Sequence, residues 1–356
     1  MRSKNAKEPR HIVDANSISL VPAQAPGLVH SVASPLQIEL ATLDFNLFLL
    51  SFTTLFFNTN VKLILVQFFT INSAYFSKND TLKLTFPYCY SILYALFYCL
   101  LEGIPLVKKW KVKIPELSGD KERRAYIYLP ASYNQNPDRR YPVMYMFDGH
   151  NVFFDSDATY GKSWGMNKYM LESKKQLIIV AIECNHEGNA RLEEYSPFDS
   201  ETASLGKIKG KGKLYMTWLI KTLKPFIDKK YRTLPDRKNT FICGSSMGGL
   251  MAMYGVTTYN HVFQRAACLS PSLWINSGKV LELIAKSNIR RDTCIYMDYG
   301  SEEMFNHVAN AEALISTSHL LLTKRVNLAF RIVPGGTHSE SCWEQQIPIF
   351  MECLGI

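Results

Sequence analysis

The stretch FICGSSMGGLMAMYG, residues 241–255, places two adjacent serines among glycines, directly after a short run of β-branched and aromatic residues. Small residues at the point where a strand ends and a helix begins indicate that another group comes very close to the backbone there. The segment from Gly244 to Gly248 fits the pattern G-x-S-x-G, with Ser246 at its centre. In this strand-to-helix context, the pattern predicts a sharp turn that exposes the Ser246 hydroxyl as a nucleophile.

The predicted position of Ser246 at the start of a helix also suits the chemistry of acyl transfer. The helix dipole and the free N–H groups of the first turn favour developing negative charge there, so we expect the backbone N–H of Met247 to donate to an oxyanion. Ser245 is a weaker nucleophile candidate because it lacks the symmetric glycines. The competing interpretation is a glycine-rich turn with an idle serine.

A serine hydroxyl is a poor nucleophile until a base accepts its proton. The segment PGGTHSESCW, residues 334–343, places His338 in a loop after the last predicted strand and just before the final predicted helix. Of the eight histidines, only this one combines that position with glycines that permit close approach. We therefore predict that His338 is the base, against the alternative of an ordinary loop histidine.

An acid should follow the strand predicted at 293–300, orient the imidazole and stabilise its cation. The segment MDYGSEEMF, residues 297–305, offers Asp298, Glu302 and Glu303. Glu303 is favoured because it follows Gly300 in a loop, whereas Asp298 falls within the strand and its side chain could enter a helix layer. The choice among the three acids stays open, and both glutamates could instead complement the dipole of the next helix.

A second oxyanion donor should come from a loop after an earlier strand. The segment MFDGHNVFFD, residues 146–155, has that placement, and Gly149 lets the backbone turn toward the serine. We assign the second donor to the backbone N–H of His150. The alternative is that Asp148 builds an Asx turn with no role in the chemistry.

From about residue 106 onward, apolar strand-like runs alternate with helical patterns. The strands are expected at 123–130, 141–147, 176–183, 239–244, 263–270, 293–300 and 328–336, and the helices around 213–230, 247–258, 277–287, 302–323 and 341–353. This alternation predicts an α/β domain over 106–356, with a mostly parallel sheet covered by helices on both faces. Ligands bind such sheets beyond the carboxyl ends of the strands, where the predicted site residues lie.

Residues 1–105 have a different character and are predicted as a separate N-terminal hydrophobic segment. The run LTFPYCYSILYALFYCLL, residues 84–101, carries no charge and reaches the length of a membrane span. The basic segment KKWKVK, residues 108–113, follows it and would place that end on the cytoplasmic side. A membrane anchor, a packed accessory segment and an extension that is no functional part of the protein are the three interpretations.

The net charge of +9 at pH 7 is moderate and does not by itself indicate a nucleic-acid partner. From Lys108 onward the chain holds 33 of the 40 basic and 25 of the 31 acidic residues, so +8 of the surplus lies there. No aromatic-basic signature of RNA binding accompanies it. We therefore expect a solvated basic surface, with a preference for anionic ligands as the alternative.

The eight cysteines are spread singly, without a CxxC pair, which favours a reducing and hence cytoplasmic location. The segment ECNHE, residues 183–187, contains Cys184 and His186, but no second cluster has recognisable ligand spacing. We therefore predict neither a metal nor another cofactor.

With these motifs in place, residues 110–356 resemble the Putative esterase family of α/β-hydrolases. This family includes enterochelin esterases, esterase D (S-formylglutathione hydrolase), feruloyl esterases and, more distantly, mycolyltransferases. The resemblance lies in seven motifs in order: YPVMYMFDGHNVF, SWGMNKYM, EYSPF, GSSMGGLMAMY, LSPSLW, DYGSEE and GGTHSESCW. It implies an α/β-hydrolase fold with Ser246 as nucleophile, His338 as base and Glu303 as acid. Glu at the acid position departs from the Asp that many members carry.

The leading hypothesis is a serine carboxylesterase that hydrolyses a small-molecule ester through an acyl-enzyme on Ser246. An acyltransferase with the same triad, a peptidase, and a membrane-tethered binding protein without catalysis are the alternatives. Aromatic residues near the site loops could form the substrate pocket or belong to the core: Phe153, Trp164, Trp274 and Phe305. The residues do not identify the natural substrate or the oligomeric state.

Overall fold

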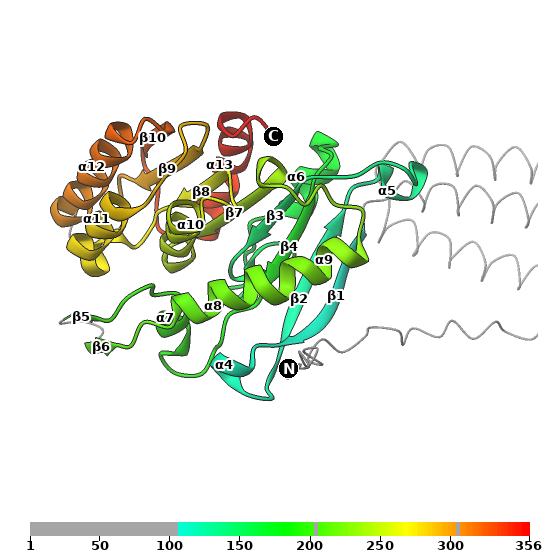
Figure 1. Cartoon of the computed structure of the whole chain (residues 1–356), viewed down its shortest axis with the longest axis horizontal. Helices are drawn as coiled ribbons and strands as arrows, with labels where there is room; N and C mark the ends of the chain where they lie inside the picture. The colour runs from blue at the N-terminus through cyan, green and yellow to red at the C-terminus, as the bar shows by residue number, and fades with distance from the viewer. Residues whose placement is uncertain (1–105, 203–205, 304–306) are drawn as a thin grey trace, which may run out of the picture. The chain divides into compact units, whose positions relative to one another are not determined.

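The structure, a computed structural model, describes residues 106–202, 206–303 and 307–356 (Figure 1). Its main feature is an eight-stranded sheet in the order β1-β2-β4-β3-β7-β8-β9-β10. The strands are β1 (Leu106–Lys113), β2 (Glu122–Leu129), β3 (Val143–Met146), β4 (Ile178–Ile182), β7 (Thr240–Ser245), β8 (Arg265–Leu269), β9 (Cys294–Gly300) and β10 (Asn327–Val333). β2 is antiparallel to both of its neighbours, and the strands from β4 to β10 in this order run parallel. The predicted mostly parallel α/β sheet is confirmed.

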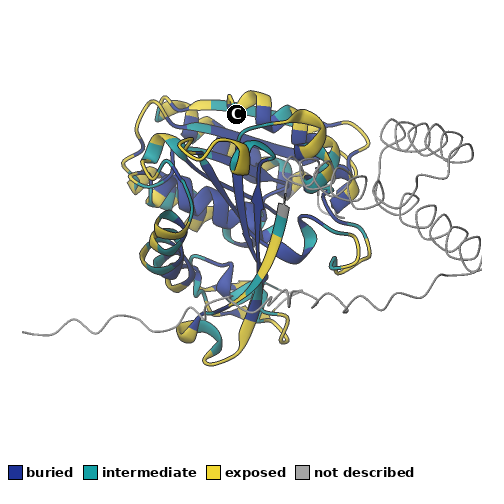
Figure 2. Ribbon diagram, turned by 90° about the vertical axis from the view of Figure 1, so that its right-hand side faces the viewer, coloured by how far each residue is buried: buried dark blue, intermediate teal, exposed yellow. Residues whose placement is uncertain are grey.

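Both faces of the sheet are buried, as continuous apolar strands require. In β4, Ile178, Val180 and Ile182 belong to one apolar cluster, whereas Ile179 and Ala181 belong to the other. Successive strand residues point to opposite faces, so an uninterrupted apolar strand fills two cores at once. Figure 2 shows the strands as a buried layer inside the domain.

Helices cover the two faces unequally. One face packs against α8 (Gly212–Trp218), the π-helical turn η2 (Leu219–Leu223), α9 (Lys224–Lys230), α10 (Met247–Thr258), α11 (Ser277–Lys286) and α12 (His307–Thr323). The other packs against α6 (Met166–Ser173) and α13 (Glu340–Cys353). α10 is buried along nearly its whole length, which explains why its sequence is apolar all round rather than on one stripe. Because α10 is buried, it fixes the position of the turn at Ser246 that precedes it.

Short elements complete the described part of the chain. They are α4 (Pro115–Ser118), α5 (Ser132–Gln135), η1 (Gly149–Asn151), α7 (Ala190–Glu194), η3 (Arg237–Asn239) and η4 (Leu273–Asn276), with a two-stranded sheet of β5 (Ser200–Thr202) and β6 (Gly206–Ile208). Of these, η1 and α7 bear most directly on the candidate site.

The basic segment 108–113 has a role that the sequence interpretation missed. It forms most of β1, the edge strand of the main sheet, and pairs along its length with β2. Val112 is buried, while Lys108 and Lys111 are exposed. Lysines on an edge strand discourage pairing with a second chain, which gives these exposed lysines a role within the sheet.

Residues 1–105, including the apolar run at 84–101, lie outside the described residues. The predicted boundary near residue 105 and the predicted anchor therefore stay predictions. Within residues 106–202, 206–303 and 307–356, no helix combines the length and the apolar content that crossing a bilayer requires.

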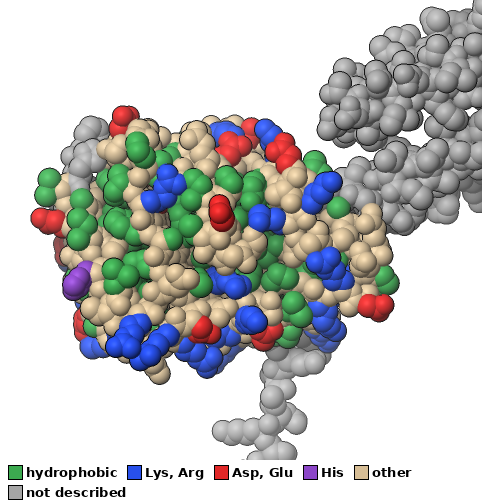
Figure 3. Space-filling view, turned by 90° about the horizontal axis from the view of Figure 1, so that it is seen from above, with side chains coloured by type: hydrophobic (Ala, Val, Ile, Leu, Met, Phe, Trp, Pro, Cys, Tyr) green, Lys and Arg blue, Asp and Glu red, His purple; other side chains and the backbone are tan. Residues whose placement is uncertain are grey.

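The surplus positive charge is dispersed on the face of the domain that Figure 3 shows. Lys and Arg side chains lie there singly or in small groups, separated by apolar and acidic side chains. Nucleic-acid-binding surfaces typically gather basic residues in one patch or stripe. On this face, the distribution is that of a solvated surface.

Candidate active site

The residues predicted to carry the chemistry follow neighbouring parallel strands. Ser246 follows β7, Glu303 follows β9, His338 follows β10, and Gly149 and His150 follow β3. Because the carboxyl ends of parallel strands meet at one edge of a sheet, all of them lie at that edge.

Ser246 occupies the sharp turn that its flanking glycines predict. Its backbone angles are φ 57° and ψ −124°, a strained conformation for a residue with a side chain. A Cβ on Gly244 would lie 2.5 Å from the carbonyl oxygen of Gly248, and a Cβ on Gly248 would lie 3.0 Å from Cβ of Phe147. Gly244 therefore allows β7 and the start of α10 to approach closely, and Gly248 allows the start of α10 to approach Phe147, which follows β3.

Glu303 and His338 form a buried acid–imidazole pair. His338 Nδ1 lies 2.9 Å from Glu303 Oε2, and the carboxylate is 2% exposed while the imidazole is 22% exposed. The backbone N–H of Gly300 donates to Glu303 Oε1 at 2.8 Å. Glu302 is exposed and makes no side-chain contact with His338 in the described residues. Of the three candidate acids, Glu303 alone has the geometry of the triad acid.

The loops that carry Glu303 and His338 touch through their backbones. A Cβ on Gly300 would lie 2.2 Å from the carbonyl oxygen of Gly336, and the N–H of Glu302 donates to that oxygen at 2.9 Å. Two glycines, one in each loop, thus bring the acid within hydrogen-bonding distance of the base.

Asp298, the third candidate acid, forms hydrogen bonds with Ser270 and Tyr296 and not with His338. Its Oδ1 accepts the N–H of Ser270 at 3.0 Å and its Oδ2 accepts the hydroxyl of Tyr296 at 2.8 Å. Burial raises the pKa of Asp298 to about 7. Its carboxyl points into the domain as the strand position suggested, away from His338.

A further set of contacts holds the acid–base pair, and the sequence reasoning did not foresee it. Ser270 Oγ donates to Glu303 Oε1, and the indole Nε1 of Trp343 donates to Ser270 Oγ at 2.8 Å. The Trp343 ring also packs edge-on against the His338 imidazole, with ring centroids 5.1 Å apart. These two residues therefore restrain both partners of the pair. Their motifs, LSPSLW and GGTHSESCW, were visible, but nothing in them indicates this contact.

The hydroxyl of Ser246 is turned toward another serine. Its Oγ lies 3.4 Å from Ser272 Oγ, and no hydrogen bond joins Ser246 to His338 among the described residues. Hydrogen bonds between catalytic groups are often long or misaligned before substrate binds. The arrangement therefore supplies nucleophile, base and acid at one edge, with the serine side chain outside hydrogen-bond geometry with the base.

Both predicted oxyanion donors lie in the first turn of a helix, where N–H groups have no intrahelical acceptor. Met247 begins α10, and His150 is the second residue of η1. A Cβ on Gly248 would lie 3.3 Å from Asp148 Oδ2, so the turn before η1 packs directly against the start of α10. The predicted donor loops are therefore neighbours.

Asp148 makes an ion pair rather than the alternative Asx turn. Arg191 Nε donates to Oδ1 at 2.8 Å and Arg191 Nη2 donates to Oδ2 at 2.7 Å, and Asp148 forms no side-chain cap on η1. Burial by itself would raise the pKa of Asp148, but the charge and hydrogen bonds of Arg191 lower it below 3.8. An ion pair between the buried Asp148 and the half-buried Arg191 of α7 thus anchors the loop that carries His150.

The aromatic residues proposed for a substrate pocket divide in two. Phe153 and Trp164 are 1% and 3% exposed and belong to the core beside α6 and α13, so they offer no surface to a ligand. That interpretation is corrected. Trp274 is partly exposed and walls a small cavity beside His338, with room for roughly one water molecule. Phe305 lies outside the described residues.

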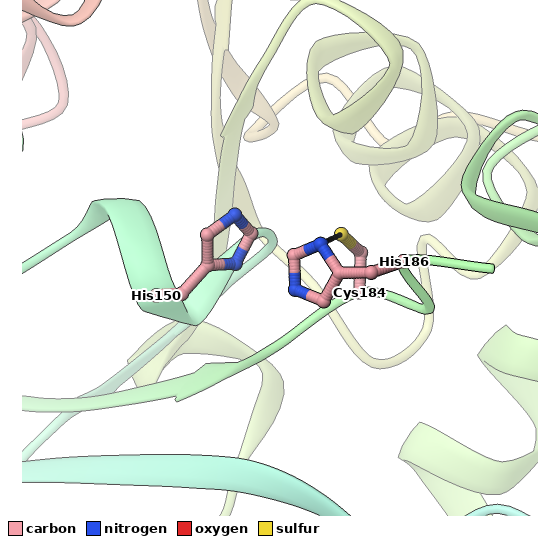
Figure 4. Close-up of side chains that lie close together, drawn as sticks. All are labelled: His150, Cys184 and His186. Carbon is pink, nitrogen blue, oxygen red and sulfur yellow. Dashed lines mark hydrogen bonds between the residues drawn. The ribbon is translucent and has the colours of Figure 1, made fainter. Parts of the chain in front are cut away.

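Side chains suited to a metal ion lie beside the predicted oxyanion loop. His150, Cys184 and His186 have ligand atoms within 4.8 Å of one another (Figure 4). Burial lowers the pKa of His150 to about 4, so its ring is neutral near pH 7. The sequence suggested only the pair Cys184 and His186, because His150 comes from a different loop.

Comparisons with known proteins agree with this fold. The family model described as "Putative esterase" matches residues 118–350. The Bacillus subtilis (strain 168) protein YbbA, described as uncharacterized, is 25% identical over 184 residues, which are 51% of this chain and 69% of YbbA.

Among solved structures, a ferulic acid esterase is similar with a TM-score of 0.54 and 19% identity, over 71% of this chain and 98% of that one. An IroE-like serine hydrolase from Shewanella oneidensis is similar with a TM-score of 0.52 and 20% identity, over 70% of this chain and 88% of that one. At these identities, the structural matches establish a shared α/β-hydrolase fold.

Proposed function

The chain belongs to the Putative esterase family, and from that membership we propose that it is a serine carboxylesterase with Ser246 as nucleophile. The observation that carries the proposal is the 2.9 Å hydrogen bond between His338 and Glu303, at the sheet edge where the strained Ser246 lies. The family implies small-molecule esters as substrates. Water is the proposed acceptor of the acyl group.

In the first step, the Ser246 hydroxyl rotates from Ser272 toward His338. Nε2 of His338 takes the hydroxyl proton while Oγ attacks the ester carbonyl carbon. Glu303 accepts a hydrogen bond from Nδ1 and stabilises the imidazolium that forms. Because Ser270 and the N–H of Gly300 hold the other carboxylate oxygen, Glu303 needs no rearrangement in this step.

The tetrahedral intermediate places negative charge on the former carbonyl oxygen. The N–H groups of Met247 and His150 are proposed to donate to that oxygen. The imidazolium of His338 then returns its proton to the leaving alcohol as the C–O bond breaks, which leaves the acyl group on Ser246. A water molecule, deprotonated by His338, attacks the acyl carbon, and the same proton transfers release the carboxylic acid and restore Ser246.

The proposal is tested by replacing the nucleophile and comparing it with its neighbour. Ser246→Ala should lower the hydrolysis of p-nitrophenyl acetate by roughly 10³-fold or more and abolish labelling by a fluorophosphonate probe. Ser245→Ala is the matched control and should keep both. A Ser246→Ala enzyme that folds and hydrolyses at the unaltered rate would exclude the mechanism.

The same reagents separate the remaining possibilities. A wild-type chain that folds but is never labelled behaves as a binding protein on a hydrolase scaffold. A chain that is labelled, but transfers acyl groups to added alcohols or sugars faster than to water, is an acyltransferase with the same triad.

A further inference from the structure

Three side chains from two separate loops converge beside the turn that carries the predicted oxyanion donor. His150 belongs to η1, which follows β3, while Cys184 and His186 belong to the segment after β4. One nitrogen of each imidazole and the Cys184 sulfur all lie within 4.8 Å of one another. Figure 4 shows the His150 ring pointing toward His186 and Cys184.

One ring nitrogen of His150 is hydrogen-bonded, and the other has no partner within residues 106–202, 206–303 and 307–356. Its Nε2 lies 3.0 Å from Thr159 Oγ1, which fixes the ring. Its Nδ1 is buried and has no hydrogen-bond partner among the residues that the structure describes, and His150 is only 3% exposed. A buried polar atom without a partner costs free energy, and a bound ion is one arrangement that would satisfy it.

In His186 too, one ring nitrogen is hydrogen-bonded to an oxygen, and the other faces Cys184. Its Nε2 lies 3.1 Å from Glu183 Oε1, while its Nδ1 lies 4.0 Å from Cys184 Sγ. Arg124 holds that carboxylate in turn, donating to Glu183 Oε1 through Nη2 at 2.7 Å. Metal-binding histidines commonly give their second nitrogen to a carboxylate or another oxygen, which orients the ring. Both imidazoles show that arrangement here.

The spacing of the donors is close to that of a coordination sphere. Three atoms no more than 4.8 Å apart lie within about 2.8 Å of a common point (4.8 Å divided by √3). Zinc binds sulfur at about 2.3 Å and imidazole nitrogen at about 2.0–2.1 Å. Each donor therefore needs to move by less than about 1 Å. Because the His186 side chain is 51% exposed, water can reach a fourth position.

We propose that His150 Nδ1, Cys184 Sγ and His186 Nδ1 bind a divalent ion of the zinc type, with water as the fourth ligand. One thiolate and two neutral imidazoles are a donor set that zinc favours. Binding releases the Cys184 thiol proton to solvent. The ion joins the loop after β3 to the segment after β4, and so restrains the backbone of His150. No step of the proposed ester hydrolysis passes through it.

Cobalt(II) is the probe, because a cobalt–thiolate bond gives a charge-transfer band in the near ultraviolet. The full chain, freed of metal by dialysis against a chelator, should bind one equivalent of Co²⁺ with that band. Zn²⁺ should then displace the cobalt and remove the band. Cys184→Ser should abolish the band, and His186→Ala should weaken Co²⁺ binding by at least about tenfold.

Cys353→Ser is the matched control, since Cys353 is an exposed free thiol on α13, and it should leave the titration unchanged. His186 is exposed, so His186→Ala tests the site even if Cys184→Ser fails to fold. In each variant, the melting temperature without metal checks the fold. Cobalt binding that persists unweakened in His186→Ala, or a wild-type chain without a thiolate band, overturns the proposal.

Discussion

The loops that carry Glu303 and His338 are held in place differently from the loop that carries His150. In the first region, backbone meets backbone: Gly300 and Gly336 leave no space for a Cβ between the loops. In the second, the contact is an ion pair between Arg191 of α7 and the buried Asp148, which directly precedes η1. The first arrangement depends on shape and the second on charge.

The two kinds of contact are expected to respond differently to pH and to bound ions. Backbone contacts between glycines do not change with pH or ionic conditions, so this restraint on the two loops does not depend on protonation. A charge-anchored loop depends on protonation, and on an ion if one binds at His150. The two regions meet where Asn151 Nδ2 donates to Glu340 Oε1 at 2.9 Å, a buried carboxyl whose pKa burial raises.

The largest effect is expected from the carboxylate that is hydrogen-bonded to His338. Glu303→Gln should lower kcat by roughly 10³–10⁴-fold, because an amide cannot stabilise the imidazolium in the same way. The KM for p-nitrophenyl acetate should change little. Glu302→Gln, at the exposed neighbouring position, should keep the wild-type rate. Equal rates in the two variants would mean that His338 works without this acid.

Gly300→Ala tests the shape-dependent region directly. The added Cβ would lie 2.2 Å from the carbonyl oxygen of Gly336, a backbone atom that cannot rotate away. We expect the free energy of unfolding to fall by about 3 kcal/mol, as measured by urea denaturation. Gly278→Ala is the control: its Cβ would meet nothing nearer than 4.0 Å, and alanine favours the helix. If both variants are equally stable, the close approach of the two loops is wrong.

Arg191→Met tests the charge-dependent region. Removing the guanidinium leaves the buried Asp148 carboxylate without its ion-pair partner, and we expect a loss of about 2 kcal/mol at pH 7, since Arg191 is 31% exposed. Arg191 lowers the pKa of Asp148, so its stabilisation is present above about pH 4 and is lost as the pH falls through the lowered value. Without Arg191, the same carboxyl is instead protonated more readily.

The decrease in unfolding free energy caused by Arg191→Met should therefore be smaller at pH 4 than at pH 7, because the Asp148 carboxyl of the variant is protonated more readily as the pH falls. Denaturation curves at both pH values will show this difference. Lys286→Met removes an exposed pair with Glu282 and should cause no measurable loss. A loss that is the same at both pH values would point to packing rather than charge.

Asp298→Asn sharpens the contrast, because Asp298 is a titrating group buried in the first region. Burial raises its pKa to about 7, so the folded state binds more protons than the unfolded state between about pH 4 and pH 7. The wild-type free energy of unfolding should fall across that range for this reason. The variant should lack that contribution, so its free energy of unfolding should fall less across the same range. Parallel pH profiles of the two proteins would contradict the assignment.

The sequence predicted the fold well where local pattern and tertiary environment agree. Continuous apolar runs can be buried only in a sheet covered on both faces, and the observed strands lie within a few residues of the expected ones. In the main sheet the exception is β1, where Lys108 and its neighbours resembled the flank of a membrane span, and the short strands β5 and β6 were not predicted either. An edge strand buries little of its surface, so its apolar signal is weak.

Site features that depend on residues close together in the sequence could be predicted, whereas features that depend on side-chain direction could not. The elbow at Ser246 depends on glycines within two residues of the serine, so the sequence alone determined it. The choice of Glu303 over Asp298 needed the direction of each side chain, which residue order does not contain. Phe153 and Trp164 were misassigned because large aromatic residues fill cores as readily as pockets.

Contacts between distant loops were decided only by the tertiary structure. Trp343 reaches Ser270 from a helix on another part of the chain, and Arg191 reaches Asp148 from α7. His150 meets Cys184 because β3 and β4 are neighbours in the sheet. Sequence periodicity reports which residues are buried, since burial of a face follows from local geometry. It does not report which strand ends lie side by side, because strand order is set by the packing of the whole domain.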